Sequence, residues 1–228
     1  MRRLLCAVLL LPLLPLLPGC VGWFFSGESW IDRTRPVVLV ETIGGVEFGA
    51  ATEFGVLTLG RTATEGPCRV HYFLGPTPMV DDGLIVAAGS TFARAEIDLK
   101  TQLARVMDRT PSDEDELVVM WTPDGTTTQS VAVHLARREA VEGDVLEPPG
   151  QELPPGAAVL RNADDGTVQF VGLIAGKATV AGPGGGDYFV FAGVDRIREL
   201  IAMPVQHPQD LAPKYRPDDI TVMKPVKK

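Results

Sequence analysis

Residues 154–202 contain three strand-like segments and one helix-like segment in close succession, and this order restricts the fold more than any other part of the chain. Ala157 to Leu160 is a short apolar run, and Thr167 to Ala175 is rich in apolar, β-branched and aromatic residues. Between them, Asn162 to Gly166 has the composition of a tight turn. Together these segments predict a β-hairpin.

The second half of this stretch predicts another strand and a closing helix. Gly182 to Gly186 is too rich in glycine for regular structure, and Tyr188 to Ala192 is a strand candidate. Asp195 is expected to cap the helix, because an Asp side chain can accept hydrogen bonds from the first free N–H groups. The predicted apolar side of this helix consists of Ile197, Leu200 and Ile201.

Upstream, short β-rich runs alternate with turns rich in Gly, Pro and Asp. Thr91 to Met107 fits both the alternation of a strand and the stripe of a helix, so its type stays open. Short strands at this spacing favour an all-β barrel or sandwich over an alternating α/β fold. The predicted strands are Val37–Val40, Phe54–Leu59, Arg69–Leu74, Leu84–Ala88, Leu117–Trp121 and Ser130–Leu135.

The N-terminus has the form of an export signal. Two arginines precede an apolar run from Leu4 to Leu17, which is too short to span a membrane comfortably. The run ends in Leu17-Pro18-Gly19-Cys20, which resembles the lipobox of bacterial lipoproteins. The resemblance implies cleavage before Cys20, acylation of its sulfur and amino group, and a membrane anchor in the cell envelope, facing the periplasm or the exterior. The alternative is an ordinary secretory signal with an incidental cysteine.

We therefore expect a signal peptide at 1–19, an anchor and tether at 20–36, a folded domain at 37–203 and a Pro-rich tail at 204–228. The aromatic residues of the tether could rest at the membrane interface or pack on the folded domain. Removal of 1–19 changes the formal charge from −8 to −10, because Arg2 and Arg3 are lost. A charge of this sign argues against a nucleic-acid partner. The tether aromatics are Trp23, Phe24, Phe25 and Trp30.

The order of segments in 154–202 resembles the end of the trypsin-like serine proteases, especially the bacterial periplasmic stress proteases. The motifs V-G-L-I-A-G and F-A-G-V-D-R-I-R-E-L carry the resemblance. In that family the loop before the hairpin holds the nucleophilic serine, and here the same position falls on Pro155. Proline has neither a hydroxyl nor a backbone N–H, so it can supply neither the attacking oxygen nor an oxyanion donor. No Ser or Cys follows Ser130.

Two upstream segments extend the resemblance in family order. Asp82 to Gly89 is similar to the strand that presents the catalytic histidine, and Gly89 stands at the histidine position. The segment D-E-L-V-V is similar to the one that carries the catalytic aspartate, so a carboxylate survives as Asp115 or Glu116. Of the nucleophile, base and orienting carboxylate that a triad needs, only the carboxylate is left.

The resemblance implies an all-β fold of two six-stranded antiparallel barrels with a short C-terminal helix. The degenerate positions Gly89, Asp115 and Pro155 imply a lipid-anchored, catalytically inactive domain. Its partners would be the membrane, through the acyl chains on Cys20, and an extended peptide or an envelope protein. Edge-strand binding uses backbone groups and does not need a triad.

Two other functions stay open at this level. One is an active hydrolase with a relocated site, using Ser90, or Ser130 with His134; the other is a purely structural envelope lipoprotein. No cofactor is expected, and the three scattered histidines lack a zinc-binding spacing. Cys68 would be the one cysteine left beside Cys20 after cleavage, and we expect it to be a small buried side chain.

Overall fold

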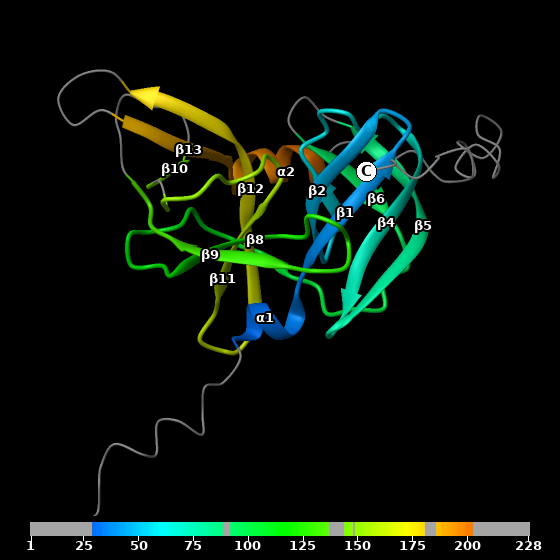
Figure 1. Cartoon of the computed structure of the whole chain (residues 1–228), viewed down its shortest axis with the longest axis horizontal. Helices are drawn as coiled ribbons and strands as arrows, with labels where there is room; N and C mark the ends of the chain where they lie inside the picture. Colours follow the sequence, from blue (N-terminus) through cyan, green and yellow to red (C-terminus); the bar gives the residue numbers. More distant parts are fainter. Residues whose placement is uncertain (1–28, 89–91, 137–143, 148, 181–185, 203–228) are drawn as a thin grey trace, which may run out of the picture.

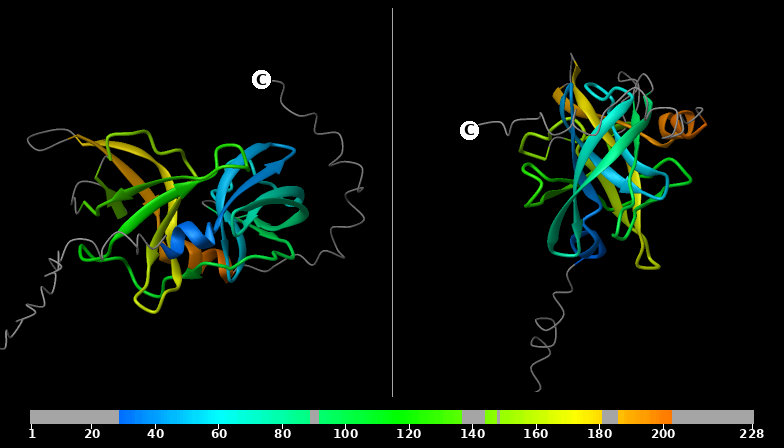
Figure 2. Two further views of the ribbon diagram at one scale, coloured as in Figure 1. Left: turned by 60° about the horizontal axis from the view of Figure 1, so that its bottom comes forward. Right: turned by 90° about the vertical axis from the view of Figure 1, so that its right-hand side faces the viewer.

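Two β-lobes make up the described part of the chain (Figures 1 and 2). The computed structural model of the protein describes residues 29–88, 92–136, 144–147, 149–180 and 186–202. Residues 182–185 of the predicted glycine loop, the predicted tail and Cys20 lie outside these residues, whereas Gly186 is already the first residue of a strand. The two described helices, of five and eight residues, are too short to span a bilayer.

The first lobe is a closed antiparallel barrel with the strand order β1-β2-β3-β6-β5-β4. Closure pairs every strand on both sides and leaves no free sheet edge. Inside the barrel lies a cluster of buried side chains that includes Val38, Val70 and Cys68, so Cys68 is buried as expected. The strands are β1 (Val37–Thr42), β2 (Gly45–Thr52), β3 (Gly55–Thr58), β4 (Gly66–Leu74), β5 (Thr77–Ala88) and β6 (Ala93–Glu96).

The second lobe is a sheet with the strand order β10-β13-β12-β11-β8-β9. Its two ends meet where Leu135 bridges to Leu146 and the Ala136 N–H donates to the Val145 carbonyl oxygen at 2.8 Å. This contact curls the sheet into the second of the two predicted barrels. The strands are β8 (Leu117–Trp121), β9 (Gln129–Val133), β10 (Asp144–Leu146), β11 (Ala158–Asn162), β12 (Val168–Val180) and β13 (Gly186–Ala192), while β7 (Arg105–Val106) pairs with β12 in parallel.

The hydrophobic core extends across the junction of the lobes. One cluster of buried side chains lies within each barrel, and a third combines residues from both. In the third cluster Leu57 and Phe73 come from the first barrel, whereas Leu160 and Phe170 come from the second. Burial of apolar surface stabilises such a contact by roughly 25 cal/mol per Å². The two barrels are therefore joined by a continuous apolar core.

Two short helices lie at the ends of the folded region. Helix α1 (Trp30–Thr34) begins after Ser29, whose hydroxyl accepts a hydrogen bond from the Asp32 N–H at 3.1 Å. Trp30 is 45% exposed, and it approaches the β11–β12 turn so closely that a Cβ on Gly166 would come within 2.8 Å of the indole. Trp30 thus packs on the barrel, and the other tether aromatics lie outside the described residues.

Helix α2 (Val194–Ile201) buries Ile197 and Leu200, as the sequence predicts. The predicted cap is wrong, because the N-cap residue is Gly193, which makes no side-chain capping bond. Asp195 lies instead in the first turn, where its carboxylate pairs with Arg198 at 3.2 Å. A carboxylate in the first turn still interacts favourably with the helix dipole.

The segment that the sequence left ambiguous is not helical in its described part. Residues 92–107 contain the strands β6 and β7; Phe92 is buried at the junction of the barrels and Ala95 inside the first barrel. The sequence does not predict the strand β2, because its glycines at 45 and 49 resemble turn residues. A Cβ on Gly49 would come within 2.2 Å of the Leu57 carbonyl oxygen, so glycine permits the close approach of β2 and β3.

Candidate functional site

The loop before β11 contains Pro155, which stands where the family that the sequence resembles has its nucleophilic serine. Pro155 is exposed at a turn, and the two residues after it have their N–H groups already bonded. Gly156 N–H donates to the Ile174 carbonyl oxygen at 2.8 Å, and Ala157 N–H donates to the Pro154 carbonyl oxygen at 3.1 Å. None of these three residues offers a free backbone donor for an oxyanion hole.

Gly156 also fixes how closely the two barrels meet. Its φ is +88°, and a Cβ there would come within 2.7 Å of the Phe48 carbonyl oxygen on β2. Glycine adopts this left-handed conformation without steric cost, and its lack of a side chain allows the contact. The backbone of the first barrel therefore lies directly against this loop.

The histidine position follows β5, which ends at Ala88 as the resemblance predicts. Gly89 and Ser90 both lie outside the described residues, so the structure places neither of them. Glycine has no proton-accepting side chain, so Gly89 cannot act as the general base of a triad.

Asp115 is one of the two carboxylates that the resemblance offers for the third triad position, and two arginines hold it. Arg109 binds it through two nitrogens, Nη1 to Oδ2 at 2.8 Å and Nη2 to Oδ1 at 2.7 Å. Arg161 on β11 places its Nε 2.9 Å from Oδ1, and the Ser112 N–H donates to Oδ2 at 2.7 Å. These bonds connect the segment before β8 to β11. They leave the carboxylate saturated with donors from the protein itself.

The electrostatics of Asp115 follow from this geometry. Only 3% of its side chain is exposed. The hydrogen bonds from Arg109 hold the pKa of this carboxyl well below its usual range, with Ser112 and Arg161 adding to the effect against the opposing effect of burial. Such charge-assisted bidentate bonds are among the strongest in proteins. We therefore assign Asp115 a structural role, while its neighbour Glu116 is exposed.

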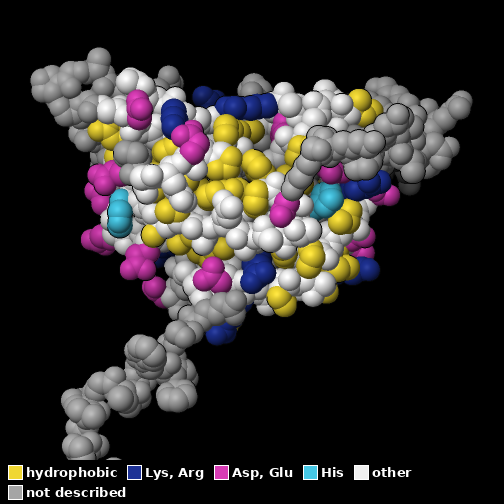
Figure 3. Space-filling model, viewed as in Figure 1, with side chains coloured by type: hydrophobic (Ala, Val, Ile, Leu, Met, Phe, Trp, Pro, Cys, Tyr) yellow, Lys and Arg dark blue, Asp and Glu magenta, His cyan; other side chains and the backbone are white. Residues whose placement is uncertain are grey.

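The relocated dyad of Ser130 and His134 is not formed. Ser130 lies on β9, opposite Met120, and His134 follows the end of the same strand. Four residues along an extended strand span about 13 Å, far beyond hydrogen-bond reach. The other described histidine, His71, lies on β4 of the first barrel, and its Nε2 is 3.3 Å from Glu41 Oε1. Histidine side chains accordingly lie far apart on the face shown in Figure 3.

The described residues contain no group of three or more His, Cys, Asp or Glu side chains that could hold a metal ion.

Hydrophobic side chains gather in the middle of the face shown in Figure 3, between the two barrels. The strand β12 runs through this part of the molecule (Figure 1).

The feature of β12 that can bind a ligand is its second half. Up to Leu173 it pairs with β11, and Ile174 still bonds to residues 156 and 157. Residues 176–180 pair with β13 on one side, Ala175 lies at the bulge between Ile174 and Gly176, and within the described chain residues 175–180 have no strand on the other side. We call these residues the β12 edge. Unpaired backbone groups on such an edge can bond to an added strand.

Two side-chain contacts border the β12 edge. Arg61, which lies between β3 and β4 in the first barrel, donates from Nη2 to the Ala175 carbonyl oxygen. Lys177 pairs with Glu152 in the loop that leads to Pro155, and its ammonium lies 5.3 Å from the centre of the Phe189 ring. The edge therefore lies between the first barrel and the Pro155 loop. The sequence alone could not show this, because it depends on where β11 ends relative to β12.

Arg61 is positioned by a buried carboxylate. Glu47 on β2 accepts hydrogen bonds from the Gly60 N–H at 3.0 Å, the Ala63 N–H at 3.1 Å and both the N–H and the hydroxyl of Thr62. Burial raises the pKa of Glu47, but these hydrogen bonds together lower it below its ordinary value. The segment that carries Arg61 is thus fixed on both sides of the arginine.

No family model and no curated protein matches the chain. Solved structures do match it. A mutant of Rv3671c from M. tuberculosis H37Rv, in its inactive form, superposes with a TM-score of 0.51 and 14% identity, covering 79% of this chain and 94% of that one. Kallikrein-related peptidase 10 in complex with Zn²⁺ superposes with a TM-score of 0.51 and 10% identity, covering 75% and 94%. Identities this low establish the fold alone, which is the two-barrel fold of the trypsin-like serine proteases.

Proposed function

We propose that this chain is a lipid-anchored, catalytically inactive domain of trypsin-like fold that binds an extended peptide or protein segment in the cell envelope. The observation that carries the proposal is the combination of an open β12 edge with a neighbouring loop that has no nucleophile. Glycine and proline occupy the two positions that would need an imidazole and a hydroxyl. The carboxylate at the third position is bonded to two arginines.

The β12 edge supports peptide binding by strand addition. An added strand gains main-chain hydrogen bonds from the edge, and its alternate side chains contact the surface on either side. The bond from Arg61 to the Ala175 carbonyl oxygen would be exchanged for one from the peptide. No proton transfer or covalent step is needed, so this mode of binding is compatible with loss of the triad.

Strand β9 is the competing edge. Residues 129–133 pair with β8, and the described chain places no second strand beside them. We favour β12 because it borders the Pro155 loop and the apolar junction of the barrels, whereas Gln129, Ser130 and Ala132 on β9 are exposed. Apolar surroundings lower the effective dielectric constant, and this strengthens backbone hydrogen bonds.

Anchoring rests on Cys20. Two acyl chains are sufficient for stable membrane attachment, at about 0.8 kcal/mol per buried CH₂, whereas one chain is not. The N-cap of α1 is Ser29, nine residues after Cys20 in the sequence. A fully extended chain covers at most about 3.6 Å per residue, so the folded domain would lie within roughly 30 to 35 Å of the membrane surface.

Amide hydrogen exchange tests the proposal. The purified, lipidated protein in detergent is mixed with a synthetic library of ten-residue peptides, and exchange is followed by mass spectrometry. We expect protection of residues 175–180 with no change at 129–133. The matched control is a library with N-methylated amides, which cannot donate backbone hydrogen bonds. Protection at β9 alone, or equal protection by both libraries, would contradict strand addition at β12.

A further inference from the structure

The β12 edge is closed at its start. Gly156 N–H donates to the Ile174 carbonyl oxygen at 2.8 Å, and Ile174 N–H donates to the Ala157 carbonyl oxygen at 2.9 Å. From Leu173 back toward its first residue, β12 pairs with β11. A strand added to residues 175–180 therefore cannot continue beside β12 past Ala175, because the loop before β11 already occupies that position. We call this the closed end of the β12 edge.

Arg61 stands at the closed end. Its Nη2 donates to the Ala175 carbonyl oxygen, and it lies 3.8 Å from the position that a Cβ on Gly176 would take. Ala175 lies at the bulge of β12 and has no register partner on β13. The guanidinium group therefore lies against the backbone of the first two residues of the edge.

The guanidinium of Arg61 carries a charge that no carboxylate of the described residues compensates by an ion pair. The Glu47 carboxylate, which fixes the segment around Arg61, bonds to residues 60, 62 and 63. Arg61 is exposed, and its bond to Ala175 uses only one of the several N–H donors of a guanidinium. The other donors are available to a ligand at the closed end.

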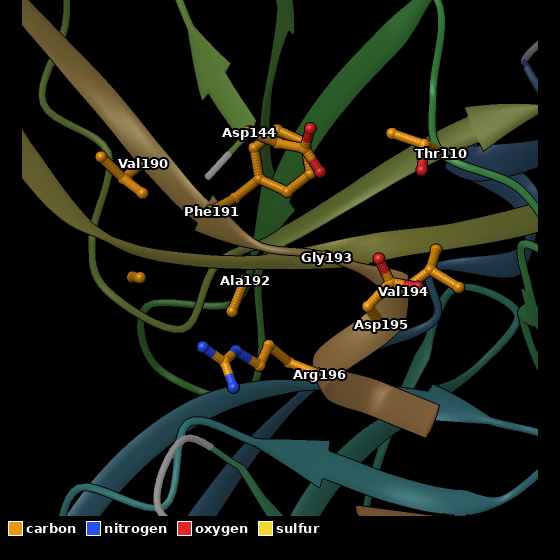
Figure 4. Close-up of a pocket in the computed structure, with 10 residues that line it drawn as sticks. Thr110, Asp144, Val190, Phe191, Ala192, Gly193, Val194, Asp195 and Arg196 are labelled. Atoms are coloured by element: carbon orange, nitrogen blue, oxygen red, sulfur yellow. The ribbon is translucent and has the colours of Figure 1, made fainter. Parts of the chain in front are cut away.

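A cavity of about 410 Å³ also lies near the start of the edge, but it does not suit an anion. Ala175 is part of its wall, and so are the side chains of Asp144 and Asp195 (Figure 4). Arg196 lines the cavity as well, but it pairs with Glu199 at 3.2 Å. The strand order β10-β13-β12 places Asp144 beyond β13, away from the free side of β12. Carboxylates repel an anionic ligand, which is therefore favoured at the closed end instead.

The direction of an added strand decides which of its termini meets Arg61. The strands β12 and β13 are antiparallel, and antiparallel pairs are the commoner kind in protein sheets. Because β12 runs from Ala175 toward Val180, an antiparallel strand on its free side reaches Ala175 with its C-terminal end. A parallel strand that starts there would bring an N-terminal ammonium against the guanidinium, and these like charges repel.

We propose that the closed end of the β12 edge binds the free C-terminal carboxylate of an antiparallel peptide, and that Arg61 is the residue that binds it. This inference rests on the proposed function and names the class of peptide, which ends at Ala175 and does not pass it. The N–H of the last peptide residue replaces Arg61 on the Ala175 carbonyl oxygen. The guanidinium then turns to the carboxylate, whose two oxygens match its fork of donors.

Peptide acids and peptide amides of the same sequences test the inference. One ten-residue library is synthesised twice, with a free C-terminal carboxylate and with a C-terminal amide. Each is titrated into the purified, lipidated protein, and amide exchange of residues 175–180 is the readout. We expect the amides to bind at least tenfold more weakly. Equal protection by acids and amides would leave the proposed function standing and overturn the inference. Absence of protection by either library would overturn the proposed function, and the inference with it.

The variant Arg61→Gln removes the charge at the closed end. We expect it to lower the affinity of peptide acids to that of the amides, whereas Arg61→Lys keeps the charge without the fork and should retain part of the preference. The matched control is Arg196→Gln, which removes a 56% exposed arginine from α2 and should leave the preference unchanged. An equal loss in Arg61→Gln and Arg196→Gln would show a general effect of net charge and would contradict the inference.

Spin labels test the direction of the bound strand. A peptide acid carries a nitroxide either on its first or on its second-to-last side chain, and NMR follows the amides of Ala175 and Gly176. In an extended ten-residue peptide these two positions lie roughly 25 Å apart, at about 3.3 Å per residue. We expect strong broadening from the second-to-last position only. Strong broadening from the first position would mean a parallel strand and would overturn carboxylate binding by Arg61.

Discussion

The carboxylate of Asp115 contacts two guanidinium groups that differ in exposure, and this difference sets the expected cost of removing it. Arg109 is 47% exposed and Arg161 only 20% exposed. Loss of one member of a buried ion pair costs about 3–5 kcal/mol, and the exposure of Arg109 reduces this figure. We therefore predict that Asp115→Asn lowers the free energy of unfolding by about 2–4 kcal/mol in urea denaturation. Glu116→Gln, the adjacent exposed control, should have little effect.

The contribution of the Asp115 ion pairs to the free energy of unfolding decreases at low pH. The pKa of Asp115 is lower in the folded protein than in the unfolded chain. Its contribution is therefore fully present above the ordinary carboxyl pKa of about 4 and decreases as the pH falls toward the lower, folded-state value. The stability difference between wild type and Asp115→Asn should shrink over that window. A difference that stays constant on acidification would contradict the ion-pair account.

Asp144 is predicted to behave in the opposite way. Its pKa is raised by burial and by Asp195, so ionisation of its carboxyl destabilises the folded state as the pH rises through that raised pKa. We expect Asp144→Asn to stabilise the protein at neutral pH by on the order of 1 kcal/mol, since it removes a partly buried charge that no described side chain pairs. Thermal unfolding of the wild type and Asp144→Asn at pH 7 measures this difference in stability. A large destabilisation would mean that Asp144 has a structural partner.

At the scale of elements, the segment between β3 and β4 depends on a single carboxylate. Glu47→Gln should lose the charge-assisted part of the bonds to residues 60, 62 and 63, which we expect to cost about 2 kcal/mol. Amide exchange at Gly60, Thr62 and Ala63 should accelerate, and Arg61 should lose its fixed position over Ala175. Unchanged exchange at these amides, with Glu116→Gln as the control, would contradict the role of Glu47.

Several strands and one helix of the fold could be predicted from local sequence patterns, such as runs of β-branched and aromatic residues. The hairpin of β11 and β12, the strand β8 and the apolar face of α2 follow from local patterns. The strand β2 could not, because its glycines are explained only by the close contact of Gly49 with Leu57 on β3. The helix α1 is five residues long, too short for a periodic signal.

The candidate site was less predictable than the fold. The identities of Pro155 and Asp115 are visible in the sequence, but the pairing of Asp115 with Arg161 depends on the adjacency of β8 and β11. The β12 edge and its contact with Arg61 depend on strand register and on the approach of the two barrels. Such long-range contacts leave no local pattern in a single sequence.

The proposed lipid anchor on Cys20 would hold the protein in the cell envelope. Cys20→Ser removes the sulfur that would be acylated, and we expect the variant to move from the membrane fraction to the soluble fraction. Cys68→Ser is the matched control, because Cys68 is buried in the first barrel. Mass spectrometry of the wild type should detect acyl chains on its N-terminal cysteine. Retention of Cys20→Ser in the membrane fraction would contradict a lipid anchor at this residue.

The claim that the whole protein binds extended peptides without cutting them is tested most directly by the masses of the peptides that it retains. The purified protein is incubated with a defined ten-residue library, separated from unbound peptides, and the retained fraction is analysed by mass spectrometry. We predict a set of retained peptides at their intact masses, with no shorter products in the unbound fraction. Cleavage products that increase with protein concentration, or an empty retained fraction, would contradict the account.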